Sequence, residues 1–177
     1  MFEELSAVAV QFAPAAGAGV DANLRLIVDH IRDGAGGGAR LVVFPELSLS
    51  GFPVDGELTT HRPGTDRRLA EIARATRDSG AYAVVGFAER GTGAATFNSA
   101  GLFGPGGLIG VVRKRHLPGL ERSWFAPGDL PPVFATRVGT VAIVICYDAW
   151  FPEYVKPLAV RGAEIIVNIN SIWAGGR

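Results

Sequence analysis

Short apolar runs alternate with helical patterns in the first half of the chain, and this alternation restricts the fold more than any other sequence feature. Apolar residues between positions 21 and 33 recur at helical spacing, and Asp21 is expected to cap that helix. The predicted order is strand, helix, strand, helix and strand, at residues 5–12, 21–33, 40–45, 65–79 and 82–88. Such an order is typical of an α/β domain in which helices cover a sheet.

The second half of the chain contains paired strand patterns and one more helix. A glycine-rich turn at 104–107 separates two apolar runs, which together predict a β-hairpin. The remaining predicted strands lie at 131–136, 140–145 and 164–169, with a helix that begins near Pro152. The sequence shows neither an internal repeat nor an interdomain linker. We therefore predict a single domain over residues 1–177.

Three residues that can carry chemistry each follow a predicted strand: Glu46, Lys114 and Cys146. Taken alone, each has an ordinary explanation, as a solvated carboxylate, a member of a basic cluster and a small buried thiol. Taken together, they supply a base, a cation and a nucleophile. A thiol that attacks a carbon bonded to nitrogen needs a proton acceptor and a positive charge near the developing anion. The combination predicts a hydrolase of carbon–nitrogen bonds.

The contexts of these residues resemble the motifs of a known family. Glu46 lies in FPEL at 44–47, Lys114 in RKRHL at 113–117, and Cys146 in CYD at 146–148. In order and spacing the chain is similar to the nitrilase superfamily of carbon–nitrogen hydrolases, from about Val8 to Asn170. Members of this family normally continue well past the strand that follows the nucleophile helix. The resemblance therefore implies that the chain represents the N-terminal two-thirds of the usual domain.

The resemblance implies an α-β-β-α sandwich and a two-step mechanism through a covalent thioester. Glu46 would take the thiol proton, Cys146 would attack, and Lys114 would stabilise the tetrahedral anion. Glu121 resembles a second glutamate that positions substrate or assists proton transfer, although a surface ion pair with Arg122 or a neighbouring arginine is an alternative. We also expect the strand-to-helix turn at Cys146 to favour a thiolate. Neither a cofactor nor a metal is implied.

The substrate class is indicated by the residues around the nucleophile. The CYD segment looks like that of amidases and carbamoylases, whereas nitrilases usually carry Trp and Glu after the cysteine. We therefore expect a small-molecule amide or N-carbamoyl substrate, and keep two alternatives: a nitrilase acting on a nitrile, and a catalytically silent or incomplete binding relative. The residues predicted to bind substrate are Phe52, Trp124, Tyr147, Trp150 and Asn170, with Trp173 as a further candidate.

Composition restricts the partners. Seventeen basic and seventeen acidic residues balance, so the chain lacks the positive field that nucleic acids or anionic membranes attract. A single cysteine is incompatible with an internal disulfide framework. The N-terminus carries Glu3 and Glu4 and the chain lacks a long apolar run, so we expect a cytoplasmic protein with no membrane partner. The family resemblance implies a homo-oligomer that forms through the nucleophile helix, with contacts from Tyr154, Val155, Leu158 and Ala159.

Overall fold

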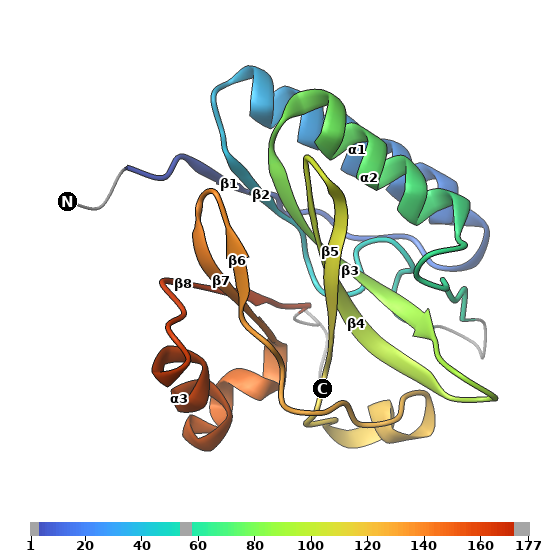
Figure 1. Cartoon of the computed structure of the whole chain (residues 1–177). Coiled ribbons are helices and arrows are strands. Elements are labelled where there is room, and N and C mark those ends of the chain that lie inside the picture. Colours follow the sequence, from blue (N-terminus) through green and yellow to red (C-terminus); the bar gives the residue numbers. More distant parts are fainter. Residues whose placement is uncertain (1–3, 54–57, 172–177) are drawn as a thin grey trace.

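The computed structural model describes residues 4–53 and 58–171. In these residues two sheets lie face to face between helical layers (Figure 1). Helices α1 (Val20–Gly36) and α2 (Arg67–Ser79) cover one sheet, and α3 (Pro152–Val160) covers the other. The predicted α-β-β-α sandwich is confirmed. Among the described residues, no helix combines the length and apolarity that crossing a membrane requires.

The first sheet has five strands in chain order, β1 to β5. The first three strands are parallel, and each crossover between them contains a helix, α1 or α2. Strand β4 runs antiparallel to both of its neighbours, β3 and β5. The predicted hairpin is confirmed at the turn between β4 and β5. The bounds are β1 (Ala7–Ala9), β2 (Leu41–Val43), β3 (Tyr82–Arg90), β4 (Thr96–Gly104) and β5 (Gly107–Arg113).

The second sheet has three strands in the order β6-β7-β8. Strand β7 (Gly139–Ile145) is central, antiparallel to β6 (Phe134–Thr136) and parallel to β8 (Ile165–Ile169). Helix α3 forms the crossover between the two parallel strands. The described residues also form three short 3₁₀ helices, η1 (Gly17–Gly19), η2 (Gly119–Ser123) and η3 (Cys146–Trp150).

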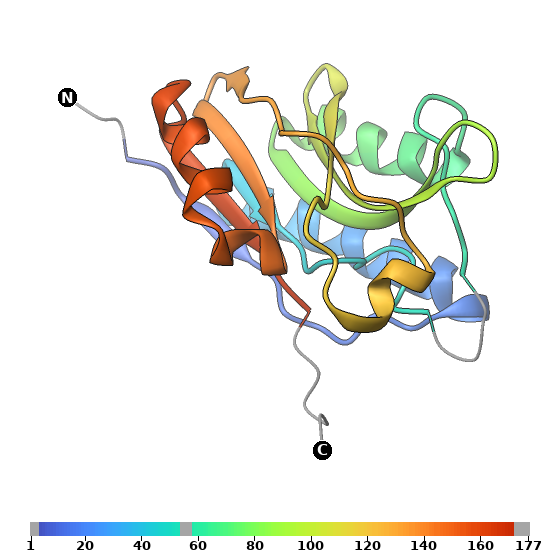
Figure 2. The same cartoon turned by 90° about the horizontal axis from the view of Figure 1, so that it is seen from below.

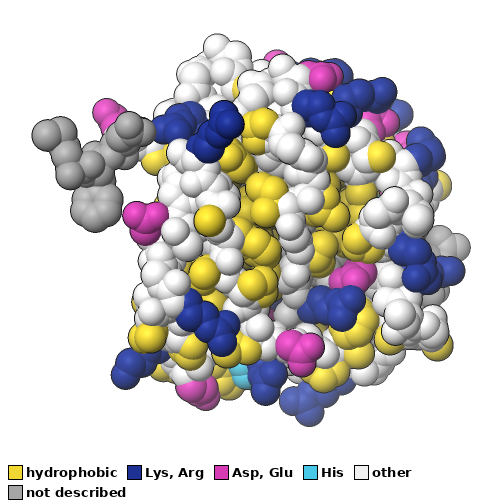
Figure 3. All heavy atoms as spheres, viewed as in Figure 1, with side chains coloured by type: hydrophobic (Ala, Val, Ile, Leu, Met, Phe, Trp, Pro, Cys, Tyr) yellow, Lys and Arg dark blue, Asp and Glu magenta, His cyan; other side chains and the backbone are white. Residues whose placement is uncertain are grey.

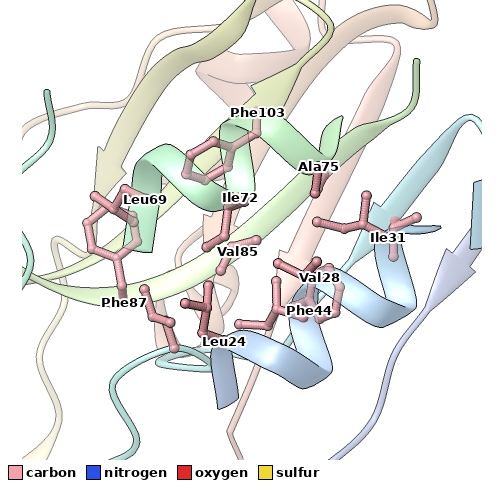
Figure 4. Close-up of a cluster of buried hydrophobic side chains, with 14 of the residues drawn as sticks. Leu24, Val28, Ile31, Phe44, Leu69, Ile72, Ala75, Val85, Phe87 and Phe103 are labelled. Atoms are coloured by element: carbon pink, nitrogen blue, oxygen red, sulfur yellow. The ribbon is translucent and has the colours of Figure 1, made fainter. Parts of the chain in front are cut away.

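The largest apolar core lies between the helices and the first sheet (Figure 4). Its helical side chains recur at three- and four-residue intervals, so one face of each helix points at the sheet. The labelled members from the helices are Leu24, Val28, Ile31, Leu69, Ile72 and Ala75. A second core fills the space between the sheets, with Leu102 from β4 and Ile143 from β7 both fully buried. Burial on both faces explains why the strands read as continuous apolar runs.

Apolar side chains also gather at the surface where the edges of the two sheets meet. Figure 3 shows them at the centre of the molecule, in the same view as Figure 1. Phe134 of β6 packs against the second core, and a side chain at Gly110 of β5 would lie 2.4 Å from its ring. The glycine thus lets the aromatic ring approach the backbone of the facing sheet. Ile109 on the same edge strand is 41% exposed.

Two sequence predictions about helix residues are wrong. Asp21 does not cap α1, whose N-cap position is Gly19; its carboxylate instead accepts hydrogen bonds from Arg68 and Arg67 of α2. Tyr154 and Leu158 do not face outward for an oligomer contact. Both are buried against Ala142 and Val144 of β7, because the face of α3 that carries them packs onto its own sheet.

A glycine to alanine substitution at position 86 tests how tightly β3 supports the loop after β2. A Cβ at Gly86 would lie 2.5 Å from the Leu47 nitrogen and 2.6 Å from the Pro45 oxygen. We expect Gly86→Ala to lower the free energy of unfolding by about 1–3 kcal/mol, measured by urea denaturation, because the backbone must shift. Gly106→Ala is the control, since a Cβ there meets no atom within 4 Å. Equal stabilities of the two variants would contradict the close approach.

Candidate active site

The loops that follow β2, β5 and β7 meet at one end of the sandwich, the end seen in Figure 2. Lys114 directly follows β5 and Cys146 directly follows β7, while Glu46 lies three residues beyond the end of β2 at Val43. Sheets place functional groups at strand ends in this way, because strands close in space need not be close in sequence. The candidate site therefore draws on both sheets.

A buried ionic cluster forms the centre of this site. The Lys114 Nζ donates to Glu46 Oε1 at 2.7 Å and to Glu121 Oε1 at 2.8 Å. Both Lys114 and Glu46 have fully buried side chains. The other hydrogen bonds to Glu46 come from Asn98 Nδ2 to Oε1 at 2.8 Å and from the Ser171 amide to Oε2 at 3.0 Å. Three groups from distant segments thus fix one carboxylate.

The cluster changes the acidity of two of its members. Burial works against the charged form of Lys114, but the carboxylates of Glu46 and Glu121 outweigh it and raise the lysine pKa. Burial also raises the pKa of Glu121, an effect that the Lys114 ammonium opposes without cancelling. Lys114 therefore remains a cation, while Glu121 holds a proton more readily than an exposed glutamate. A carboxyl group with a raised pKa is suited to proton transfer near neutral pH.

Cys146 lies at the strained turn between β7 and η3. Its φ angle is 48°, and among the described non-glycine residues only Leu47, next to Glu46, shares a positive φ. Such conformations cost free energy and often occur at functional sites, where they aim a side chain. The side chain of Cys146 is half-buried.

The prediction that this turn favours a thiolate is wrong. Burial, followed by the charge of Glu46, raises the pKa of the Cys146 thiol to about 11, although Lys114 acts in the opposite direction. The turn continues as the short 3₁₀ helix η3 rather than as an α-helix, so the aligned dipoles that would lower the pKa are limited. The thiol is neutral at pH 7 and needs a base to react.

The predicted substrate-binding residues occupy different positions around the cluster. Phe52 and Trp124 pack against an apolar group that includes Leu47. The backbone oxygen of Asn170 accepts a hydrogen bond of 3.3 Å from the Glu46 amide. These three residues border the site, and their roles in binding stay predictions. Trp173 lies outside the described residues.

The two remaining predicted residues belong to the nucleophile turn. Tyr147 lines a cavity of about 540 Å³, together with Phe125, Phe151 and Arg122 among other residues. Trp150 is 78% exposed and lies 5.6 Å from the Tyr147 ring, centroid to centroid. It is therefore at the surface rather than against the buried cluster. In the part of the chain that the structure describes, no group of three His, Cys, Asp or Glu side chains could hold a metal ion.

Sequence reasoning missed two partners of Glu46. Asn98 lies in β4 and is fully buried, and an amide side chain in a strand pattern was a usable signal. A buried amide needs hydrogen-bond partners, so a polar residue in such a strand indicates a polar neighbour. The Ser171 contact uses the backbone amide, which carries no side-chain signal.

A family model and several known proteins match most of this chain. The carbon-nitrogen hydrolase family model matches residues 7–177. A nitrilase from Pyrococcus abyssi is 37% identical over 153 residues, which are 78% of this chain and 54% of that protein. An (R)-stereoselective amidase from a Pseudomonas species is 38% identical over 135 residues, 76% of this chain and 49% of that protein. The chain thus spans about half the length of these curated relatives.

A solved structure of similar fold is the glutamine-dependent NAD+ synthetase of Acinetobacter baumannii. It superposes with a TM-score of 0.78 at 26% identity, over 94% of this chain and 32% of that chain. The chain belongs to the carbon-nitrogen hydrolase family, the nitrilase superfamily.

Proposed function

We propose that this chain hydrolyses a non-peptide carbon–nitrogen bond of a small amide or N-carbamoyl compound, with Cys146 as the nucleophile. The observation that carries the proposal is the buried cluster in which Glu46 interacts with both the Lys114 ammonium and the Cys146 thiol. A carboxylate between a neutral thiol and a cation can accept the thiol proton during attack. The chain spans about half the length of its curated relatives. The activity of the whole protein is therefore proposed here, too, and not taken from those relatives.

In the first step Glu46 accepts the thiol proton while the Cys146 sulfur bonds to the substrate carbonyl carbon. The carbonyl oxygen becomes an anion, which Lys114 and the backbone amide of Tyr147 would stabilise. The tetrahedral intermediate then expels ammonia or an amine, which receives the proton from Glu46. Water attacks the resulting thioester and gives a proton to a carboxylate. The carboxylate passes this proton to the departing sulfur, so that the acid product leaves and the thiol re-forms. The sum is amide plus water to acid plus ammonia or amine.

Glu121 would take part as a second carboxylate. Its Oε1 accepts from Lys114, whereas its buried Oε2 has no hydrogen-bond partner among the described residues. A buried acceptor without a donor is unfavourable unless another molecule supplies one. The amino group of an amide substrate carries such donors. We propose that Glu121 orients this group and shares in the proton transfers, a role that its raised pKa supports.

Two substrate classes remain as candidates beside simple amides. The similarity to glutamine-dependent NAD+ synthetases favours the side-chain amide of glutamine as a source of ammonia. The similarity to a nitrilase favours a nitrile, which the same thiol can attack at its carbon. A role as a silent binding relative is not favoured by any observation in the site, since base, cation and thiol are all present.

Ammonia release tests the proposed reaction and the role of Cys146 in it. We expect ammonia release from at least one member of a panel of aliphatic amides, aromatic amides, glutamine, N-carbamoyl compounds and nitriles. Cys146→Ala should abolish it, because the chain has no second cysteine to form the thioester. Ammonia is measured by a coupled enzymatic assay, with circular dichroism to verify the fold. Equal turnover by the variant would contradict a thiol mechanism.

A substitution at Glu46 tests its role as the base. Glu46→Gln keeps the shape of the side chain but removes its ability to accept a proton. We expect kcat to fall about 10²- to 10⁴-fold, the usual contribution of a positioned base. The matched control is Glu89→Gln, because Glu89 is also a buried carboxylate that accepts hydrogen bonds from a cation, Arg113, on the same sheet. Comparable losses of kcat in the two variants would refute the assignment of Glu46 as base.

The pH dependence of alkylation tests the raised pKa of the Cys146 thiol. Because burial and Glu46 raise the pKa of Cys146 to about 11, alkylation by iodoacetamide should keep accelerating with pH up to at least pH 10. The chain has one cysteine, so mass spectrometry reports this site alone. In the urea-unfolded chain the same thiol should titrate at about pH 8.5, the value of an exposed cysteine. A rate that levels off below pH 8 in the folded chain would show a stabilised thiolate instead.

A further inference from the structure

Asp148 is a buried carboxylate whose contacts reach from the nucleophile turn to the loop that carries Lys114. It lies in η3, two residues after Cys146, and its side chain is fully inaccessible to solvent. Its Oδ1 accepts a hydrogen bond of 2.8 Å from the His116 amide and lies 2.7 Å from His116 Nδ1. Its Oδ2 accepts from the Arg115 amide at 3.2 Å. Three donors therefore converge on one carboxylate.

The donors belong to the two residues that directly follow Lys114. The backbone of Lys114 itself is held on the other side, since its amide donates to Asn98 of β4 at 2.7 Å and its oxygen accepts from Gly128 at 2.9 Å. The Lys114 loop is thus fixed to the first sheet before this residue and to η3 after it. Because η3 continues from β7, Asp148 connects the two sheets at the point where the site draws on both.

Aromatic packing reinforces the same connection. The ring of His116 stacks on Phe151 with centroids 3.8 Å apart and planes 13° apart. The ring of Tyr154 from α3 makes an edge-to-face contact with His116, with centroids 5.5 Å apart. His116 is therefore held by a hydrogen bond to η3 and by two rings that follow it in sequence. Its hydrogen bond to Asp148 and its stacking on Phe151 fit a role in positioning the loop.

We propose that Asp148 is a positioning residue that sets the distance between the Lys114 ammonium and the Cys146 thiol by tying the lysine loop to the nucleophile turn. The proposal rests on the proposed function. A carboxylate is costly to bury without donors, and an apolar side chain would fill the same space without that cost. Two main-chain amides and a ring nitrogen, all from the lysine loop, satisfy Asp148. Small displacements of a catalytic group lower the rate far more than they lower stability.

The chain contains a matched control at a distance from the site. Asp66, which caps α2, also accepts hydrogen bonds from two backbone amides, those of Arg68 and Leu69, at 2.8 and 3.2 Å. Its second oxygen lies 3.0 Å from Nδ1 of His61. Asp66 and Asp148 therefore have the same kinds of donors, two amides and one imidazole. Asp66→Asn and Asp148→Asn remove equivalent interactions, but only Asp148 touches the lysine loop.

The test compares kcat, KM and thermal stability of the two variants with an amide that the wild-type chain hydrolyses. In Asp148→Asn the new amide donors face the Arg115 amide, so we expect kcat to fall about 10- to 100-fold with little change in KM. Asp66→Asn should lose a similar amount of thermal stability and keep its kcat. An unchanged kcat in Asp148→Asn, or an equal fall in both variants, would overturn the proposal.

Two further measurements keep the test decisive. If Asp148→Asn does not fold, His116→Phe retains the stacking on Phe151 and removes only the imidazole bond. A smaller fall in kcat supports the tie, and an unchanged kcat overturns it.

If the wild-type chain hydrolyses no substrate, the proposed function fails, and alkylation of Cys146 tests the tie alone. We expect faster alkylation at pH 8 in Asp148→Asn, because the turn loosens, and the wild-type rate in Asp66→Asn. Equal rates in all three proteins would overturn the tie.

Discussion

Lys114 is fully buried between two carboxylates, and this ionic contact determines how the loops of the site must be arranged. An ammonium group removed from water needs negative charge within hydrogen-bond distance, and removal of one partner of a buried pair typically costs about 3–5 kcal/mol. Glu46 and Glu121 meet that need from separate loops. Strands β2 and β5 must therefore finish at the same end of the sheet. Strand β3 must also leave room for the glutamate loop, and the missing side chain of Gly86 provides that room.

The same cluster explains why the thiol rests in its neutral form. Burial and the charge of Glu46 raise the pKa of Cys146, and Lys114 offsets only part of this effect because its own charge is already balanced by two carboxylates. Attack and proton transfer then belong to one step in the proposed mechanism. Substrate binding would bring a carbonyl dipole toward Lys114, where the developing anion has a cation to face. The neutral thiol also avoids a further negative charge beside Glu46 and Glu121.

The sequence was informative wherever local pattern and three-dimensional role coincide. Strand ends follow from apolar runs, so the meeting of Glu46 and Lys114 could be predicted, and the layers follow from the order of elements. Asn98 indicated a buried polar neighbour, but its identity as Glu46 could not be predicted, because it depends on which residue of β4 lies opposite the glutamate loop. The pKa of Cys146 depends on burial by distant segments. The inward face of α3, including Tyr154, depends on how the helix rotates against β7.

A covalent intermediate on Cys146 is the most direct consequence of the proposed chemistry. The measurement is intact-mass analysis of the chain, quenched in acid during turnover of an amide, followed by peptide mapping. The account predicts a mass increase equal to the acyl group of the substrate, located on the peptide that contains Cys146 and absent from Cys146→Ala. Product formation with no adduct on that peptide, when quenching is faster than turnover, would contradict a thioester mechanism.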